Sequence, residues 1–160
     1  MHLRLFNRIV LCGLLFCISF SFISPASFYG AQVVIPQGME DDILREVNLH
    51  RDSMGLKPLQ MNAVESGIAA KHSRNMASGR TPFGHQGMEQ RIKAIEKQLG
   101  AMMAAAENVA YGQMTAREVV DEWLNSPGHR KNIEGDYILC GIGWAKDSKG
   151  MPYYTQIFTK

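Results

Sequence analysis

Pro127 constrains the fold of this chain more than any other residue, because it interrupts a stretch that is otherwise strongly helical. Thr115 and Glu118 form a capping box, which predicts that a helix begins at Thr115. Pro127 cannot continue that helix, because it lacks a backbone N–H and its ring collides with the preceding turn. Ser126 and Pro127 are instead the N-cap and the first residue expected of a second, short helix.

His129 falls in the first turn of this second predicted helix. The positive end of a helix dipole disfavours an imidazolium ion, so we expect His129 to be neutral and available as a metal ligand or base. Taken alone, a histidine at such a corner between two helices is more often an exposed surface residue. Its interpretation therefore depends on the other stretches of the chain.

The first 26 residues have the composition of a secretory signal peptide. Arg4 and Arg8 provide a basic start, residues 9–22 are almost continuously apolar, and Ala26 ends a group of small residues suited to cleavage. The apolar run is shorter than the roughly 20 residues that span a bilayer, although an uncleaved N-terminal anchor is the alternative. We therefore predict a signal peptide over 1–26, a linker over 27–39 and one folded domain over 40–160. The mature protein is expected to be secreted or periplasmic, with no stable membrane insertion.

Removal of this signal peptide changes the charge and the cysteine count. The full chain has 17 Lys and Arg residues against 15 Asp and Glu residues, and Arg4 and Arg8 lie in the signal. The remaining domain is formally neutral, so its charge gives no indication of nucleic-acid binding. Of the 3 cysteines, Cys140 alone lies outside the signal. An internal disulfide is therefore excluded, and the domain must depend on its hydrophobic core.

Helical periodicity and cap residues predict helices over 40–54, 62–78 and 88–99, besides the two that meet at Pro127. Residues 100–106 contain good helix formers but no cap, so a loop or an irregular helix is expected there. Residues 137–145 and 153–158 are apolar, β-branched and aromatic, and turn residues join them into an antiparallel hairpin. Gly141 and Gly143 would permit a close approach to this hairpin. The order of elements indicates an α+β domain.

Several side chains are assigned to the interior from their positions on these elements. Trp123 lies on the apolar stripe of its helix and is expected to pack against the sheet. For His72, on the apolar stripe of helix 62–78, a hydrogen-bonded core histidine is favoured over a metal ligand. Cys140 lies in an apolar strand and is expected to be a buried apolar residue rather than a reactive thiol. Asn48 and Arg51 share one helix face and are assigned structural roles.

Five stretches of this sequence occur in a characteristic order: residues 48–51 with 55–59, 83–85, 107–112, 126–133 and 154–158. Together they resemble the CAP superfamily of cysteine-rich secretory, antigen 5 and pathogenesis-related 1 proteins, also called SCP domains. Residues 126–133 are similar to the Ser-Pro-Gly-His-Arg-x-Asn-Ile signature of its bacterial branch. The resemblance extends over about residues 40–159. It implies a three-layer α-β-α sandwich with a central antiparallel sheet and a large cleft across one face.

The resemblance also implies which residues line that cleft. His85 and His129 match the two cleft histidines of the family, and Glu107 matches the first acidic residue. The second acidic residue of the animal members has no counterpart, because Asn125 and Ser126 stand near its position. Two neutral imidazoles and one carboxylate suit a weakly held Zn²⁺ ion with an open position for water.

The function implied is a secreted binding module whose cleft takes a lipid, a peptide or another component of the cell envelope. One alternative is a metal-dependent hydrolase, with Glu107 in catalysis. Another is a structural or interaction protein in which His85, Glu107 and His129 only stabilise loops. Binding is favoured over catalysis, because no nucleophile lies next to a base: Ser126 is an N-cap and Cys140 is expected to be buried.

The chain departs from the family pattern in two ways. It lacks the disulfides of the animal members. Ala106 also replaces a glycine that usually precedes the acidic residue, and an alanine there is strained if the backbone requires a positive φ.

Overall fold

The computed structural model describes residues 38–160, in which there are five helices and four strands. The predicted signal peptide and nearly all of the predicted linker lie outside these described residues. In chain order the elements are α1 (Met39–Ser53), β1 (Gln60–Met61), α2 (Ala63–Ala77), α3 (Met88–Leu99), β2 (Ala105–Tyr111), α4 (Ala116–Asn125), α5 (Pro127–Ile133), β3 (Leu139–Lys146) and β4 (Pro152–Thr159).

The four strands form one mixed sheet in the order β1-β3-β4-β2. β3 and β4 are the predicted antiparallel hairpin, and β2 pairs antiparallel with the other side of β4. β1 runs parallel to β3, so the sheet differs at this edge from the antiparallel expectation. A strand of two residues is too short to produce an alternating pattern, which is why the sequence contained no signal for it.

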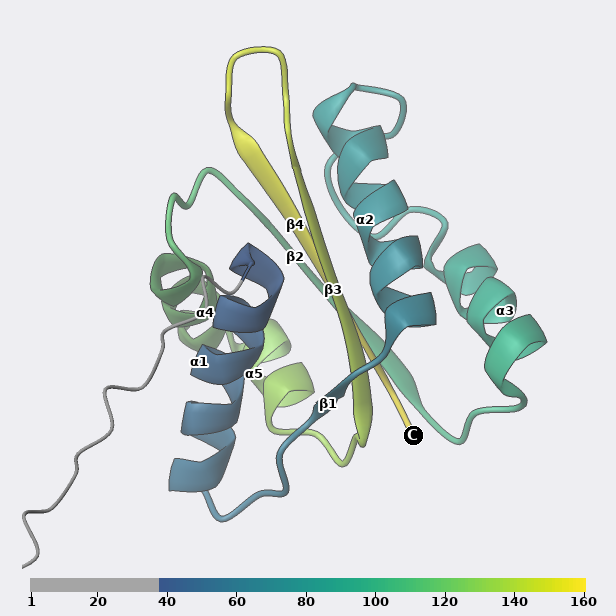
Figure 1. Ribbon diagram of the computed structural model, residues 1–160, viewed down its shortest axis with the longest axis vertical. Coiled ribbons are helices and arrows are strands. Elements are labelled where there is room, and N and C mark those ends of the chain that lie inside the picture. The colour runs from purple at the N-terminus through teal and green to yellow at the C-terminus, as the bar shows by residue number, and fades with distance from the viewer. Residues whose placement is uncertain (1–37) are drawn as a thin grey trace, which may run out of the picture. The chain divides into compact units, whose positions relative to one another are not determined.

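Helices cover both faces of the sheet (Figure 1). α1, α4 and α5 lie on one face, whereas α2 and α3 lie on the other. The larger core cluster, which includes the fully buried Trp123 and Phe158, packs beneath the first group of helices. A smaller cluster of Ala69, Ile95 and Ile157 packs beneath the second. This arrangement confirms the predicted α+β sandwich.

α2 lies against β3 at a distance that only glycine permits. A β-carbon added at Gly141 would lie 2.2 Å from the backbone carbon of Glu65, and one at Gly143 would lie 2.2 Å from the backbone nitrogen of Ala70. Both distances are far shorter than a van der Waals contact, so the close approach expected at these glycines is confirmed. This packing fixes α2, which carries His72, against the sheet.

The helix break at Pro127 occurs as predicted. Thr115 and Glu118 form the reciprocal capping box of α4, which ends at Asn125. α5 then begins at Pro127, with Ser126 as its N-cap residue. The Ser126 side chain forms no capping hydrogen bond, so the break depends on the proline ring and the extended backbone of Ser126 rather than on its hydroxyl.

The predicted interior residues are buried. Trp123 and Cys140 are fully buried, and His72 is 2% exposed. Burial raises the pKa of the Cys140 thiol to about 12, which agrees with the expectation of a buried apolar residue. Arg51 is buried as well and donates to the backbone oxygens of Lys57 (2.8 Å), Ile133 (2.6 Å) and Gly135 (2.9 Å).

Asn48 has the structural role assigned to it. Its amide nitrogen donates to the backbone oxygen of Leu59 at 3.0 Å, and its amide oxygen accepts from the backbone nitrogen of the same residue at 2.8 Å. This pair of hydrogen bonds ties α1 to the chain that enters β1.

Two local expectations differ from the structure. The segment expected as a loop or an irregular helix ends earlier, because β2 begins at Ala105 and pairs with β4 over its full length. Ala106 lies opposite Phe158, and no non-glycine residue in the range 38–160 has a positive φ, so the condition under which Ala106 would be strained does not arise. In the predicted helix 88–99, the spacing of Met88, Ile92, Ile95 and Leu99 predicts one buried side. In α3 only Ile95 is buried and Leu99 is 40% exposed, so the buried side is narrower than this spacing predicts.

Candidate functional site at the edge of strand β2

The three residues expected in the cleft come together around the edge of β2. Glu107 lies on β2 itself, not in a loop, and its carboxylate points toward the face covered by α2 and α3. His85 belongs to the segment between α2 and α3, and His129 belongs to α5 on the opposite face. The Nδ1 atom of His85 lies 3.0 Å from Oε1 of Glu107, and the His85 and His129 ring centroids are 6.3 Å apart. The site therefore wraps around the strand edge.

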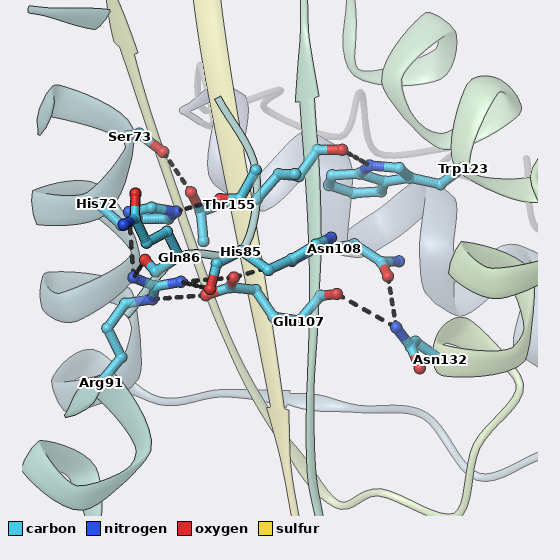
Figure 2. A network of polar contacts seen from close by, with 12 residues as sticks. His72, Ser73, His85, Gln86, Arg91, Glu107, Asn108, Trp123, Asn132 and Thr155 are labelled. Carbon is cyan, nitrogen blue, oxygen red and sulfur yellow. Dashed lines mark hydrogen bonds and ion pairs between the residues drawn. The ribbon is translucent and has the colours of Figure 1, made fainter. Parts of the chain in front are cut away.

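The Glu107 carboxylate is buried and fully engaged (Figure 2). Arg91 of α3 donates from Nε to Oε2 at 2.6 Å and from Nη2 to Oε1 at 2.7 Å, which is a two-pronged ion pair. Burial by itself would raise the pKa of Glu107, but the hydrogen bonds from His85 and Arg91 outweigh it and leave the pKa below its ordinary value. Glu107 is thus an ionised carboxylate at neutral pH.

Arg91 is itself held in place by the segment before α3. Its Nη1 atom donates to the backbone oxygen of Gln86 at 2.9 Å and lies 3.2 Å from Nδ1 of His72. The other ring nitrogen of His72 lies 2.9 Å from the backbone oxygen of Gly84. Because a carbonyl can only accept, His72 carries its proton on Nε2 and accepts from Arg91 at Nδ1.

His72 is therefore the hydrogen-bonded core histidine predicted from its position, with an added role as a support for Arg91. Burial lowers the pKa of His72, and the hydrogen bond to Gly84 only partly opposes that effect. The imidazole is neutral at pH 7 for this reason. It connects α2, the segment that carries His85, and α3.

On the opposite face, two asparagines connect α5 to β2. Asn132 donates to the backbone oxygen of Glu107 at 3.2 Å and to Oδ1 of Asn108 at 2.8 Å. Asn108 in turn donates to the backbone oxygen of His129 at 3.2 Å. Figure 2 shows this chain of contacts beside Trp123, whose indole nitrogen donates to the backbone oxygen of Val109 at 3.2 Å. α5 is therefore fixed to the strand that carries Glu107.

His129 has no partner for its buried Nδ1 atom among the residues from 38 to 160. Burial lowers the pKa of His129, and the neighbouring His85 lowers it further, while Glu122 acts weakly in the opposite direction. The lowered pKa of His129 agrees with the neutral imidazole that the sequence predicts. The main cause of the lowering is burial and not the helix dipole. A neutral imidazole keeps one ring nitrogen with a free lone pair, which is the form that can coordinate a metal or accept a hydrogen bond.

The ring nitrogens determine what the site can hold. The ionised Glu107 accepts from Nδ1–H of His85, which leaves Nε2 as the nitrogen with a free lone pair. A carboxylate that orients a histidine in this way is the usual outer partner of a metal ligand. Neutral imidazole nitrogens are ligands that Zn²⁺ and Cu²⁺ accept, so His85 and His129 are the candidate ligands at this strand edge. Within the described part of the chain no group of three His, Cys, Asp or Glu side chains is close enough to hold an ion.

Three aromatic rings pack together around Phe83, which precedes His85 by two residues. Phe83 is 47% exposed and Tyr111 is 51% exposed, with ring centroids 4.8 Å apart in an edge-to-face arrangement. Tyr153 lies opposite Tyr111 in the sheet, and the two rings stack with centroids 5.7 Å apart. We call Phe83, Tyr111 and Tyr153 the aromatic surface. Tyr111 lies four residues beyond Glu107 on β2, and Tyr153 lies beside it on the neighbouring strand β4.

Arg91 and Asn132 are the site residues that sequence reasoning missed. Arg91 stands in the predicted helix 88–99, and no contact is predicted for it from the sequence. Its position near the start of that helix was a usable signal, because the dipole disfavours a cation there unless an acidic partner is close. Asn132 lay inside the signature stretch around His129, but nothing in the sequence indicated that it would contact β2.

The chain belongs to the CAP family, the cysteine-rich secretory protein family, whose sequence profile matches residues 44–158. It is 36% identical over 110 residues to the uncharacterized protein YkwD of Bacillus subtilis, covering 67% of this chain and 42% of that protein. It is 32% identical over 126 residues to the uncharacterized membrane protein YlbC of the same species, and the match covers 76% of this chain and 34% of that protein. The chain thus spans less than half the length of these two relatives.

Solved structures show the same fold. An outer surface protein of Borrelia burgdorferi is 23% identical with a TM-score of 0.64, covering 78% of this chain and 96% of that protein. An extracellular SCP-domain protein of Bacillus anthracis is 25% identical with a TM-score of 0.61, and the match covers 77% of this chain and 40% of that protein. In residues 38–160 no helix combines the length and the apolarity required to cross a bilayer.

Proposed function

We propose that this chain is an extracytoplasmic binding module that uses the edge of β2 to hold a component of the cell envelope. The observation that carries the proposal is the aromatic surface, in which Phe83 and Tyr111 are exposed and Phe83 lies two residues before His85. Exposed aromatic rings provide rigid contact area at little entropic cost, and the adjacent imidazoles provide hydrogen bonds that fix orientation. The solved relatives from Borrelia burgdorferi and Bacillus anthracis are described as outer surface and extracellular proteins, which supports this location.

Hydrolysis is less well supported by the geometry. Both oxygens of Glu107 are bonded to Arg91, and Oε1 also accepts from His85. A carboxylate engaged in this way is not free to remove a proton from water, so its role is to orient His85. Cys140 is buried, with the raised pKa given above, and is therefore no nucleophile.

Cosedimentation with insoluble cell-envelope material tests the binding proposal. The wild-type domain is expected to sediment with the envelope, whereas a Phe83→Ala/Tyr111→Ala variant is expected to remain in solution. Leu49→Ala is the matched control, because Leu49 is an exposed apolar residue, at 59%, on α1. Equal sedimentation of the wild type and the double variant would contradict the proposal. Competition by soluble peptide, glycan or lipid fractions then distinguishes the ligand classes.

The same site is proposed to bind a divalent metal weakly through His85 and His129. Imidazole nitrogen favours Zn²⁺ or Cu²⁺ over Mg²⁺. Calorimetry with Zn²⁺ near neutral pH is expected to show binding by the wild type and none by His85→Ala or His129→Ala. His72→Ala is expected to retain binding but to lose stability, because His72 is buried and hydrogen-bonded at both nitrogens. Equal binding by a His85→Ala/His129→Ala variant would exclude this site.

A further inference from the structure

A second cavity, with a volume of about 660 Å³, lies between two segments that join elements of the fold. One wall is the chain that runs from α1 into β1, and the other is residues 134–138, between α5 and β3. Both segments lie at the end of the sheet where the chain terminates (Figure 1). A cavity of this volume suits a small ligand or the end of a longer one.

Arg51 contributes a buried positive charge to this cavity. The residue is 2% exposed, and its Nε and Nη1 atoms donate to the backbone oxygens of Lys57, Ile133 and Gly135. Within residues 38–160, Nη2 donates no hydrogen bond and Arg51 forms no ion pair. Both N–H groups of Nη2 therefore remain for a ligand. Water can accept from these groups, but it does not neutralise the charge.

The two acidic side chains on the cavity wall are already paired with other residues. Glu134 Oε1 lies 2.9 Å from Nε2 of His50, and Asp136 forms an ion pair with Lys160. The Asp136 side chain is also 85% exposed, so water screens its charge from the guanidinium. Lys57 lines the same cavity and, in the part of the chain that the structure describes, forms no ion pair. Buried charges in proteins are normally paired, so these two cations indicate a site for an anion.

Apolar and amide groups surround the positive charge. Leu56, Pro58, Tyr137 and Ile138 line the cavity, and Ile138 is 51% exposed. A small inorganic anion would leave these apolar side chains without a contact. Gln60 lines the cavity too, and its amide can both donate and accept a hydrogen bond. A peptide group can use both capacities, whereas an alkyl chain can use neither.

We propose that this cavity binds the C-terminal carboxylate of an apolar peptide, with Nη2 of Arg51 and the Lys57 ammonium as its partners. Capture of a terminal carboxylate is a recurring mode of peptide recognition, and a guanidinium matches the geometry of a carboxylate. The last side chain of the peptide contacts Tyr137 and Ile138. The hydrogen bonds to three backbone oxygens hold the Arg51 guanidinium in place before the peptide arrives. The cavity shares no residue with the aromatic surface or with His85, Glu107 and His129.

Calorimetry with N-acetyl-leucyl-leucine tests the proposal. The wild type is expected to bind this peptide. The C-terminal amide of the same peptide is expected to bind about tenfold or more weakly, because a hydrogen bond to a charged group is lost. Backbone amide NMR signals of residues 55–60 and 134–138 are expected to shift on titration. Absence of binding, equal binding of acid and amide, or shifts confined to other residues would overturn the proposal.

Two variants test the cavity without replacing Arg51, whose backbone contacts the fold requires. Lys57→Gln removes an exposed charge, and peptide affinity is expected to fall by up to about fivefold, the effect of one exposed ion pair. Ile138→Ser removes apolar contact area and is expected to weaken binding as well. Lys97→Gln, the same charge change at an exposed position of α3, is the matched control and is expected to bind as the wild type does. Unchanged affinity in both cavity variants would refute the site.

Octanoate distinguishes a peptide from another apolar acid. It carries a carboxylate but no peptide group, so it is expected to bind more weakly than N-acetyl-leucyl-leucine. Equal or tighter binding of octanoate would overturn the assignment to a peptide. The Phe83→Ala/Tyr111→Ala variant is expected to bind the peptide normally. Its sedimentation with envelope material and its peptide affinity are measured separately, so failure of the β2-edge function and failure of this cavity are distinguishable.

Discussion

The indole nitrogen of Trp123 donates a hydrogen bond to the backbone oxygen of Val109 across 3.2 Å. This contact joins α4, whose Trp123 belongs to the larger core cluster, to the strand that carries Glu107. The same ring is fully buried. Trp123 thus combines apolar packing with a bond to the edge of the sheet.

Trp123→Ala is expected to reduce the free energy of unfolding by about 3–5 kcal/mol, because a large aromatic side chain leaves a cavity in the core. Trp123→Phe retains part of the packing but loses the hydrogen bond to Val109, so a smaller loss is expected. Urea denaturation followed by circular dichroism measures both. An unchanged midpoint for Trp123→Ala would contradict its burial.

Gly143→Ala is expected to destabilise the fold by about 1–3 kcal/mol or more, since its methyl group would collide with the backbone of α2 at Ala70. Gly67, within α2 itself, has open space around it, and a β-carbon added there would meet nothing within 4 Å. Gly67→Ala is therefore the control and is expected to stabilise by about 0.5–1 kcal/mol. Thermal denaturation of the two variants should give shifts of opposite sign.

Arg51→Met is expected to leave the three backbone oxygens that Arg51 now satisfies without a donor. Each buried group left unsatisfied costs roughly 1–3 kcal/mol, so a severe loss of stability is expected. Arg45→Met is the control on the same helix, because Arg45 is half exposed. Its effect is expected to stay within about 0.5 kcal/mol. Similar losses in the two variants would rule out the structural role of Arg51.

Glu65 makes stability depend on pH. Burial raises the pKa of Glu65, and the hydrogen bond from Thr159 at 2.5 Å only partly opposes it. A raised pKa in the folded state means that the protonated form of Glu65 favours folding and the ionised form opposes it. The stability that the protonated form provides is fully present below the unfolded pKa near 4.5, and it is lost as pH rises through the folded-state pKa. Glu65→Gln is expected to remove this loss. Denaturation midpoints of wild type and variant that change in parallel with pH would refute it.

The helices and the β3–β4 hairpin could be predicted because their signals are local. A capping box defines the start of α4, and a proline defines the break at Ser126. A pair of glycines marks the hairpin. β2 could not be predicted, because Ala, Glu and Asn dominate its sequence and have little preference for strands. Its extended form results from pairing with β4, which is distant in sequence.

The site was predictable only in part. His85, Glu107 and His129 were selected through the family resemblance, and the structure brings them together at one strand edge. Arg91 was missed, because helical periodicity identifies the side of a helix that meets the core but not a charge that meets another charge. Its contact with Glu107 depends on how α3 docks beside β2, which is a tertiary relationship.

The hydrogen bonds from Trp123 and Asn132 have a consequence for the whole sheet. They occupy the backbone oxygens of Val109 and Glu107 on β2, one of the two outer strands of the sheet, and the other outer strand, β1, is only two residues long. Exposed strand edges invite pairing with other chains and hence aggregation. The helices that build the candidate site thus also protect the protein from strand addition between its copies.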